Sequence, residues 1–251
     1  MKIATWNVNG IRARKDDVAA FVEQEQPDVL CLQELKATPD QIPAALTWPD
    51  YWGYWHGGKG YSGVSLHVRK TVAVDSPRFW HPEFDHENRI VVAKIGSVSV
   101  ASIYVPNGGR DFAAKMGFLR ALEAYAIAAH GMGSPLLLCG DLNVARSERD
   151  VHPKQRDPRA IGQRPEERAW FERSLEAAGL HDVSREREPE NDALFTWWAP
   201  WRNLRARNIG WRLDYVLATV GLAQRATASS VFRESGTSDH GAVVVEFDCE
   251  F

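Results

Sequence analysis

Cysteine is scarce in this chain, with three residues in 251, and none of the three has the close Cys or Cys/His spacing of a metal site. We therefore expect buried or inert thiols in a reducing compartment. No apolar run approaches the roughly 20 residues that span a bilayer, and the first residues lack the apolar core of a signal peptide. These shortages predict a cytoplasmic protein without membrane contact.

An excess of positive charge is also lacking, because the formal net charge is −3 at pH 7. This balance excludes a protein that holds nucleic acid by its overall field alone, so any such contact must be local. Three basic clusters do occur, and a solvated helix face or loop is the commoner explanation for each. They comprise Arg12, Arg14 and Lys15; Lys154, Arg156, Arg159 and Arg164; and Arg202, Arg205, Arg207 and Arg212.

The composition is that of an ordinary globular protein, with 44% hydrophobic and 25% charged residues. No linker rich in Pro, Gly and Ser divides the chain, and no short repeat is visible. Large sandwich folds commonly reach this length around one core. We therefore predict a single domain over residues 1–251.

Apolar patterning predicts strands in two groups with helices between them, which favours two packed sheets covered by helices. Residues 144–165 are rich in Arg, Asp, Pro and Lys, and they predict a long exposed loop. The predicted strands cover 2–6, 29–32, 62–74, 89–95, 98–105, 135–139, 212–218, 228–232 and 242–247, and the predicted helices lie around 18–22, at 111–130 and at 165–178.

Polar residues gather where the predicted strands end or break. Singly they are weak evidence, because Asn at a turn and Asp at a helix cap are commonplace. Strand ends of one sandwich can converge on a single rim, however, so the set as a whole predicts one polar site. Its members are Asn7, Glu34, Tyr104, Asp141, Asn143, Asp214, Asp239 and His240.

Six segments that carry these residues resemble the exonuclease III family of abasic-site endonucleases, in the same order and nearly end to end. The resemblance implies a four-layered α/β sandwich, with two mainly antiparallel sheets packed face to face and flanked by helices. The larger group includes deoxyribonuclease I, sphingomyelinases and inositol polyphosphate phosphatases, so membership of that group would not fix the substrate. The segments are Trp6-Asn7-Val8-Asn9-Gly10, Cys31-Leu32-Gln33-Glu34, Tyr104-Val105-Pro106-Asn107, Gly140-Asp141-Leu142-Asn143, Trp211-Arg212-Leu213-Asp214-Tyr215 and Ser238-Asp239-His240.

The activity implied by the resemblance is a DNA-repair phosphodiesterase that cuts the backbone 5′ to an abasic site and leaves a 3′-hydroxyl. A 3′–5′ exonuclease and 3′-end trimming activity is implied as well, with duplex DNA carrying abasic sites or blocked 3′ ends as substrate and a monomer as the acting form. Hydrolysis requires water to attack an anionic phosphorus while charge accumulates on its oxygens. Mg²⁺, for which Mn²⁺ can substitute, suits this chemistry because it prefers oxygen ligands.

The resemblance assigns metal binding to Glu34, helped by Asn7 and with Asp239 as a further candidate. The alternative for Glu34 is a surface salt bridge, although a carboxylate directly after an apolar strand lies where that strand meets solvent. Asn9 stands where some relatives carry Asp, which leaves the role of a second metal ion open.

Catalytic roles are implied for five residues. Asp141 and Asn143 match the pair that holds the attacking water, with Asp141 taking its proton or orienting it. His240 is paired with Asp214, whose carboxylate would fix the imidazole tautomer and favour its charged form. Tyr104 matches the phenol near the scissile phosphate. The alternatives are a turn cap for Asp141, a structural histidine and a core tyrosine.

Substrate selection is assigned to aromatic and polar residues of two loops. Trp197 and Trp211, with Leu213 nearby, match a hydrophobic pocket that receives an abasic deoxyribose and excludes intact nucleotides. Asn107 and Arg110 match residues that grip phosphate and insert into DNA, and a Gly-rich turn before a helix is their alternative.

Two other functions remain open from the sequence. One keeps the fold and the metal ion but acts on a lipid or inositol phosphate, although no apolar membrane-binding hairpin is identifiable. The other is a non-catalytic nucleic-acid-binding module, which would predict a gap among the acidic and amide positions.

Overall fold

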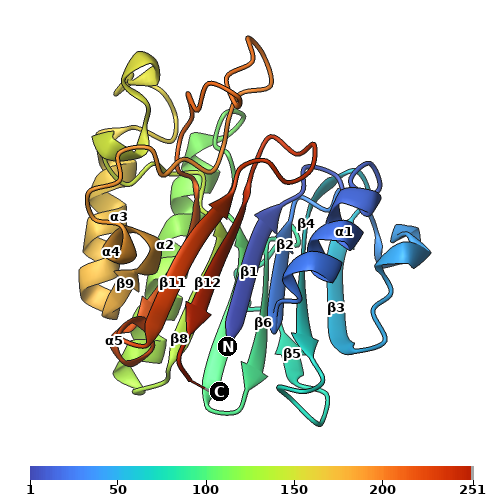
Figure 1. The fold of residues 1–251 in the computed structure, drawn as a ribbon. Coiled ribbons are helices and arrows are strands. Elements are labelled where there is room, and N and C mark those ends of the chain that lie inside the picture. The colour runs from blue at the N-terminus through green and yellow to red at the C-terminus, as the bar shows by residue number, and fades with distance from the viewer. Residues whose placement is uncertain (250–251) are drawn as a thin grey trace.

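Two six-stranded sheets pack face to face in the computed structural model, which describes residues 1–249 (Figure 1). The predicted range 1–251 therefore includes two residues that lie outside the described part. The strands are β1 (Lys2–Asn7), β2 (Val29–Gln33), β3 (Tyr51–Gly58), β4 (Tyr61–Arg69), β5 (Arg78–Trp80), β6 (Ile90–Ile95), β7 (Val98–Tyr104), β8 (Leu136–Asp141), β9 (Leu180–Asp182), β10 (Asp214–Thr219), β11 (Ala226–Phe232) and β12 (Ala242–Phe247).

The two sheets have matching topologies. The first has the order β11-β12-β1-β2-β4-β3 and the second β5-β6-β7-β8-β10-β9. In the first sheet β1 and β2 pair in parallel, in the second β7 and β8 do, and the other neighbouring strands are antiparallel. The predicted sandwich of two mainly antiparallel sheets is confirmed.

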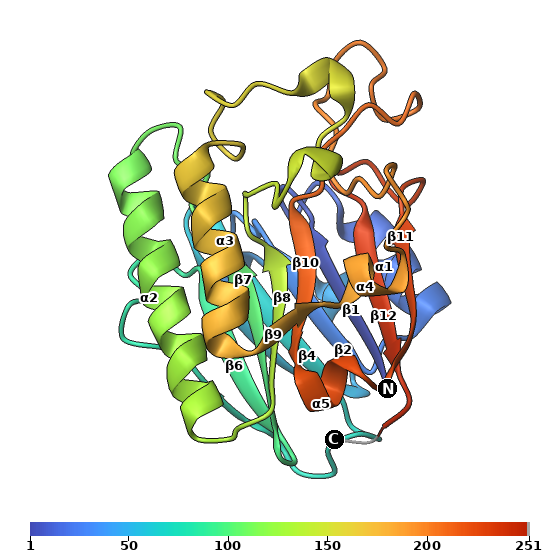
Figure 2. The same cartoon turned by 90° about the vertical axis from the view of Figure 1, so that its left-hand side faces the viewer.

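Helices cover both outer faces of the sandwich. Figure 2 shows α2 and α3 side by side over the second sheet, while α1 lies over the first. The helices are α1 (Lys15–Glu25), α2 (Phe112–Gly131), α3 (Pro165–Ala178), α4 (Val183–Arg187) and α5 (Val220–Ala223), with short 3-10 helices at Pro39–Gln41, Ala44–Leu46, Glu148–Asp150 and Pro153–Gln155.

Alternation along each strand explains the layers. Successive side chains of a strand point to opposite faces, so Ile3 of β1 enters the core between the sheets while Ala4 packs beneath α1. The central core joins residues of both sheets, such as Cys31 and Leu137. Cys31 and Cys139 are buried free thiols, as predicted.

The structure corrects two features of the expected element pattern. The strand predicted over 62–74 is wrong beyond Arg69, because a turn follows in which Val72 N donates to Arg69 O. The half-buried strand β3 and the short strands β5 and β9 were not predicted. By contrast, α3 has the predicted bounds, with Pro165 in its first turn and Gly179 in the left-handed conformation (φ 57°) directly after it.

The loop predicted as exposed over 144–165 is only partly exposed. Val144, Val151 and Gln163 are buried, and Ala145 N donates to Gly162 O across the base of the loop. Arg212 anchors the loop. This residue was expected in a solvated basic cluster, but its side chain is fully buried. Its guanidinium pairs with Asp150 at 2.7 Å and Asp182 at 2.7 Å.

Within residues 1–249, no helix combines the length and apolar character needed to cross a membrane.

Candidate functional site

The predicted polar residues converge at one end of the sandwich. The parallel pairs β1–β2 and β7–β8 end at the same end of the sandwich. Asn7 lies opposite Gln33 there, and Tyr104 lies opposite Asp141. Loops around residues 150 and 200 stand above this end (Figure 1). A cavity of about 310 Å³ opens there, lined by Asn9, Glu34, Tyr104, Asn107, Asn143, Ile161, Trp197, Trp211, Leu213, Asp239 and His240.

The side-chain amide of Asn7 bridges two carboxylates, that of Glu34, which lines the cavity, and that of Asp141 in the other sheet. Asn7 Nδ2 donates to Glu34 Oε1 at 3.0 Å and to Asp141 Oδ2 at 2.8 Å. Lys36 Nζ lies 2.8 Å from Glu34 Oε2. Burial disfavours the charged form of Glu34, but the bonds from Asn7 and Lys36 outweigh it and lower the pKa of this carboxyl group. Glu34 is therefore ionised at neutral pH.

Asp141 is held at the end of β8 by a close approach of two backbones. The preceding Gly140 has φ 149°, and a Cβ atom there would collide with the carbonyl oxygen of Ile103. Only glycine fits this position without strain. Asn143 N donates to Asp141 Oδ1 at 2.8 Å, and Asn143 Nδ2 donates to the other oxygen at 3.2 Å.

The charge state of Asp141 differs from that of Glu34. Burial raises the pKa of Asp141 to about 7, with the neighbouring carboxylates of Asp214 and Glu34 acting in the same direction and the charge of His240 opposing them. A carboxylate that titrates near neutral pH can accept a proton during a reaction.

His240 is oriented by Asp214, the partner that the family resemblance implies. Its Nδ1 lies 2.8 Å from Asp214 Oδ2, and its Nε2 lies 3.9 Å from Asp141 Oδ2. Burial disfavours the imidazolium, but the charge and hydrogen bond of Asp214 outweigh burial and raise the pKa of His240 to about 10. The ring is thus a cation at neutral pH, with Asp141 facing its second nitrogen.

Tyr104 is almost buried, at 8% exposure, and lines the same cavity. Burial and the charges of Glu34 and Asp141 raise the pKa of its phenol far above the usual range, so the hydroxyl stays protonated. The Arg89 guanidinium lies 5.0 Å from the centroid of the Tyr104 ring and donates to Tyr61 Oη at 2.6 Å.

Aromatic side chains form one wall. The Trp197 and Trp211 rings meet edge to face with centroids 5.4 Å apart, and Leu213 packs with them. Trp197 Nε1 donates to Asp239 Oδ2 at 3.0 Å, and Asn9 Nδ2 donates to Asp239 Oδ1 at 2.8 Å. The aromatic wall and the carboxylates of Glu34 and Asp239 therefore line one cavity, which is apolar on one side and polar on the other.

The two DNA-contact candidates before α2 lie differently. Asn107 lines the cavity and donates through Nδ2 to Asn143 Oδ1 at 3.3 Å. Arg110 is exposed and does not contribute to the cavity lining. The structure thus groups Asn107 with the catalytic candidates and leaves Arg110 on the rim outside.

Sequence reasoning missed three basic residues that support the site, namely Lys36, Arg89 and Lys115. Lys115 is fully buried and donates to the carbonyl oxygen of Asn143 at 2.7 Å. A signal was available, because Lys115 shares the helical spacing of the buried residues Leu119 and Leu122 on α2. A lysine within an apolar stripe indicates a buried partner.

The ligand atoms of Glu34, Asp141 and His240 lie within 4.8 Å of one another. Because His240 is held as a cation by Asp214, the oxygen atoms of this region are the better metal ligands. Glu34 and Asp239 are carboxylates whose pKa values are lowered despite burial. The oxygen-rich donor set fits a hard divalent cation.

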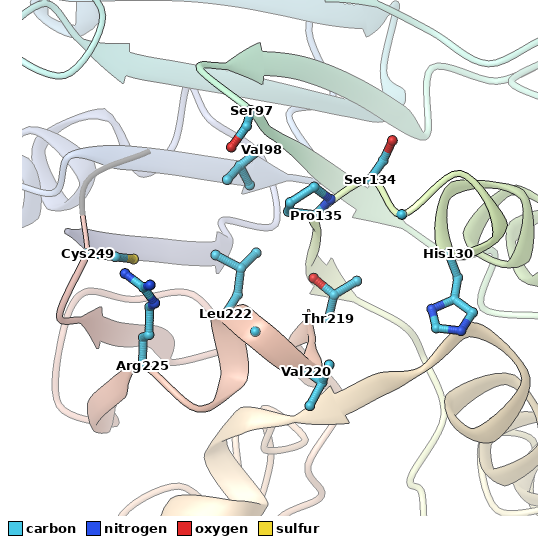
Figure 3. Close-up of a pocket in the computed structure, with 12 residues that line it drawn as sticks. Ser97, Val98, His130, Ser134, Pro135, Thr219, Val220, Leu222, Arg225 and Cys249 are labelled. Carbon is cyan, nitrogen blue, oxygen red and sulfur yellow. The ribbon is translucent and has the colours of Figure 1, made fainter.

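A second cavity, of about 500 Å³, lies at the opposite ends of β7, β8 and β10 (Figure 3). Val98, Thr219 and Leu222 line it together with Arg225, and none of the lining residues within 1–249 is an aspartate or a glutamate. The described lining of this cavity thus offers no carboxylate oxygen to a metal ion, in contrast to the lining of the smaller cavity, which includes Glu34 and Asp239.

Comparison with known proteins agrees with this arrangement. The Endonuclease/Exonuclease/phosphatase family pattern matches residues 4–240. The chain is 35% identical to the DNA repair nuclease APEX1 of Danio rerio, over 96% of this chain and 80% of that protein. It is 34% identical to the exodeoxyribonuclease of Bacillus subtilis, over 96% of each.

Solved structures give the same result. An AP endonuclease from Archaeoglobus fulgidus superposes with a TM-score of 0.89 at 30% identity, covering 99% of this chain and 100% of that one. The 3′–5′ exonuclease NExo from Neisseria meningitidis also gives 0.89, at 31% identity and with the same coverage. The chain therefore belongs to the exonuclease III family of abasic-site endonucleases, within the endonuclease/exonuclease/phosphatase family.

Proposed function

We propose that this protein is a DNA-repair phosphodiesterase that uses Mg²⁺ to cut duplex DNA 5′ to an abasic site, leaving a 3′-hydroxyl, and that also trims blocked 3′ ends. The proposal rests on the convergence of Glu34, Asp141 and His240 from distant parts of the chain. Their ligand atoms lie within 4.8 Å of one another at one end of the sandwich. The related 3′ phosphatase NExo from Neisseria has been solved bound to a product DNA hairpin, which supports DNA as the substrate.

Glu34 is the principal candidate for holding Mg²⁺, with Asn7 and Asp239 beside it. When bound, the cation supplies positive charge that stabilises the phosphoryl oxygens, and Mn²⁺ has similar ligand preferences. Asn7 donates to both Glu34 and Asp141 and so links the two carboxylates. Asn9 donates to Asp239 and holds that carboxylate at the rim.

Asp141 and Asn143 hold and activate the attacking water. The carboxylate of Asp141 takes a proton from water most effectively when its pKa lies near the working pH, and the pKa of Asp141 is raised to about 7 by burial. Asn143 donates to both oxygens of Asp141, through its backbone and its side chain, and this fixes the direction of the carboxylate.

His240 and Tyr104 stabilise the phosphate during the reaction. Asp214 occupies Nδ1 of the imidazolium, so Nε2 is the nitrogen available to donate to a phosphate oxygen. Tyr104 keeps its proton, because burial raises the pKa of its phenol, and can donate to the phosphate or to the leaving oxygen.

Trp197, Trp211 and Leu213 select the substrate by excluding intact nucleotides. A nucleotide turned out of the duplex costs a few kcal/mol of unstacking, and this cost is smallest where the base is already lost. The apolar wall then receives the bare sugar, while Asn107 contacts the phosphate beside it and Arg110 contacts DNA from the rim.

We also propose that the described chain acts as one domain and as a monomer. The central core draws residues from both sheets, and the site takes side chains from both, so neither sheet would be functional alone.

The test is a labelled DNA duplex with one abasic analogue, incubated with Mg²⁺ or with a chelator. We expect one incision 5′ to the analogue whose product a polymerase can extend, and loss of at least about 100-fold in rate for Glu34→Gln. Glu83→Gln is the matched control, because Glu83 is exposed and outside the cavity.

Each alternative predicts a different outcome. Cleavage that resists the chelator would reject the metal mechanism. Inactivity on DNA combined with turnover of an inositol phosphate or a phospholipid would favour the lipid or inositol phosphatase function. Tight DNA binding without any cleavage would favour a binding module.

A further inference from the structure

A second group of metal-ligating side chains lies where the edges of the two sheets meet. His56 belongs to β3, the edge strand of the first sheet, whereas His81 and Asp85 follow β5, the edge strand of the second. One ligand atom from each of the three lies within 4.8 Å of the other two. None of them lines the catalytic cavity.

The three groups already face one another. His56 Nε2 lies 2.5 Å from Asp85 Oδ2, and the rings of His56 and His81 stack with centroids 3.9 Å apart and 26° between their planes. Ligand atoms around a tetrahedral Zn²⁺ lie about 3.3 Å apart when the metal–ligand bonds are about 2.0 Å. Small rotations of the side chains are therefore enough to form such a site.

The surroundings hold the carboxylate and one imidazole in place. The Asp85 side chain is only 1% exposed, and its Oδ1 accepts the backbone N–H of Arg89 at 2.8 Å, which directs Oδ2 towards His56. Tyr54 Oη lies 3.3 Å from His81 Nε2, and the Tyr54 ring stacks on Phe79 at 5.4 Å. Hydrogen bonds of this kind commonly orient metal ligands in proteins.

An ion pair alone explains only part of this arrangement. The pairing of His56 with Asp85 accounts for the short contact between these two residues, but it does not require a second imidazole stacked on the first. Two protonated rings in contact repel each other, whereas two neutral rings can offer lone pairs to a shared cation. The position of His81 is the feature that favours a metal ion.

We propose that His56, His81 and Asp85 form a second metal site, which binds a divalent transition-metal ion and is best suited to Zn²⁺. Two imidazole nitrogens and one carboxylate oxygen are ligands typical of Zn²⁺ and poorly suited to Mg²⁺. Because His81 is exposed, the fourth position is open to water. The ion joins β3 to the segment after β5, and so links the edges of the two sheets.

The test uses the metal-free full chain and Zn²⁺, with a chromophoric chelator as competitor. Excess Mg²⁺ and a Glu34→Gln background suppress binding in the catalytic cavity. We expect one Zn²⁺ per chain, and His81→Ala should weaken binding by at least about tenfold. His86→Ala is the matched control, because His86 is exposed and adjoins Asp85 without belonging to the group.

Two further measurements keep the result independent of folding defects. Asp85→Asn keeps the shape of the side chain and should also lose Zn²⁺ affinity, and circular dichroism reports whether each variant is folded. Co²⁺ bound to the parent chain should show visible absorption bands of a low-coordinate site with nitrogen ligands. Equal Zn²⁺ stoichiometry and affinity in the His81→Ala and His86→Ala chains, or Co²⁺ without such bands, would overturn the proposal.

Discussion

Lys115 Nζ lies 2.5 Å from Glu167 Oε1, and both side chains are fully buried between α2 and α3. The same ammonium donates to the carbonyl oxygen of Asn143, at the start of the long loop. Glu167 Oε2 accepts the backbone N–H groups of Gly162 at 2.7 Å and Arg164 at 3.1 Å, at the end of that loop. One buried ion pair thus fastens both ends of the loop that flanks the catalytic cavity.

Lys115→Met should destabilise the protein strongly, because it leaves the Glu167 carboxylate buried without its cation. Loss of one partner of a buried pair typically costs about 3–5 kcal/mol. Urea unfolding measures this cost. Abasic-site cleavage should fall as well, because the backbone of Asn143 loses a hydrogen-bond partner.

The double variant Lys115→Met/Glu167→Gln provides the control. It should be more stable than Lys115→Met alone, because no unpaired charge remains in the core. A single variant that loses less than about 1 kcal/mol would contradict a structural role for this pair.

Trp211→Ala should reduce discrimination between abasic and intact DNA. Removing an aromatic wall lets bulkier groups enter, and pocket contacts of this kind are worth about 1–3 kcal/mol, or roughly 10- to 200-fold. The measurement is the ratio of kcat/KM for abasic duplex to that for intact duplex. Trp211→Phe keeps an aromatic surface and should retain most of the discrimination, so an equal loss in both variants would refute the exclusion role.

His67 should make stability fall as the pH drops. It is fully buried between Trp48 and Trp55, and burial lowers the pKa of its imidazole to about 3. The unfolded chain binds a proton below the ordinary value of 6.5, whereas the folded chain does not until about pH 3. The free energy of unfolding therefore decreases from pH 6.5 towards pH 3, by up to about 1.4 kcal/mol per pH unit.

His67→Leu should remove this contribution, and urea unfolding at pH values from about 1.5 units below to about one unit above the ordinary pKa would detect the change. His86→Ala is the control, since His86 is exposed. An unchanged slope in His67→Leu would show that the buried imidazole is not the cause.

Asp150 should make the free energy of unfolding depend on pH in a lower pH range than His67 does. Burial disfavours its carboxylate, but the Arg212 guanidinium and hydrogen bonds from Arg185 and Ser147 outweigh burial and lower the pKa of Asp150 to about 2. Its stabilisation is therefore complete above the unfolded value near 4 and is lost as the pH falls through about 2. The difference amounts to about 2 kcal/mol.

Asp150→Asn should reduce the pH dependence of stability in the range of about pH 2 to pH 4. Thermal unfolding scans at steps of about half a pH unit would measure this change. Asp75→Asn is a suitable control, because Asp75 is exposed. Equal curves for the two variants would argue against the ion pair with Arg212.

Much of the element pattern was predictable from local sequence. Runs such as Val29–Leu32 are apolar because both faces of their strands are covered, and they end sharply at Glu34. The helix over Pro165–Ala178 has its own start and stop residues. Strand β3 was missed because it lies at a sheet edge, where half-buried Trp, His and Gly residues show no clear alternation.

The sequence by itself determined which residue types stand at the strand ends, and therefore that oxygen and imidazole groups could gather at one edge. The family resemblance implied the pair of His240 with Asp214. Only the tertiary structure decided the other partners and charge states. Lys115 with Glu167, Arg212 with Asp150, and His56 with Asp85 are each separated by dozens of residues along the chain. Local periodicity records which face of an element is apolar, but the pKa and pairing of a buried group depend on what the rest of the fold places beside it.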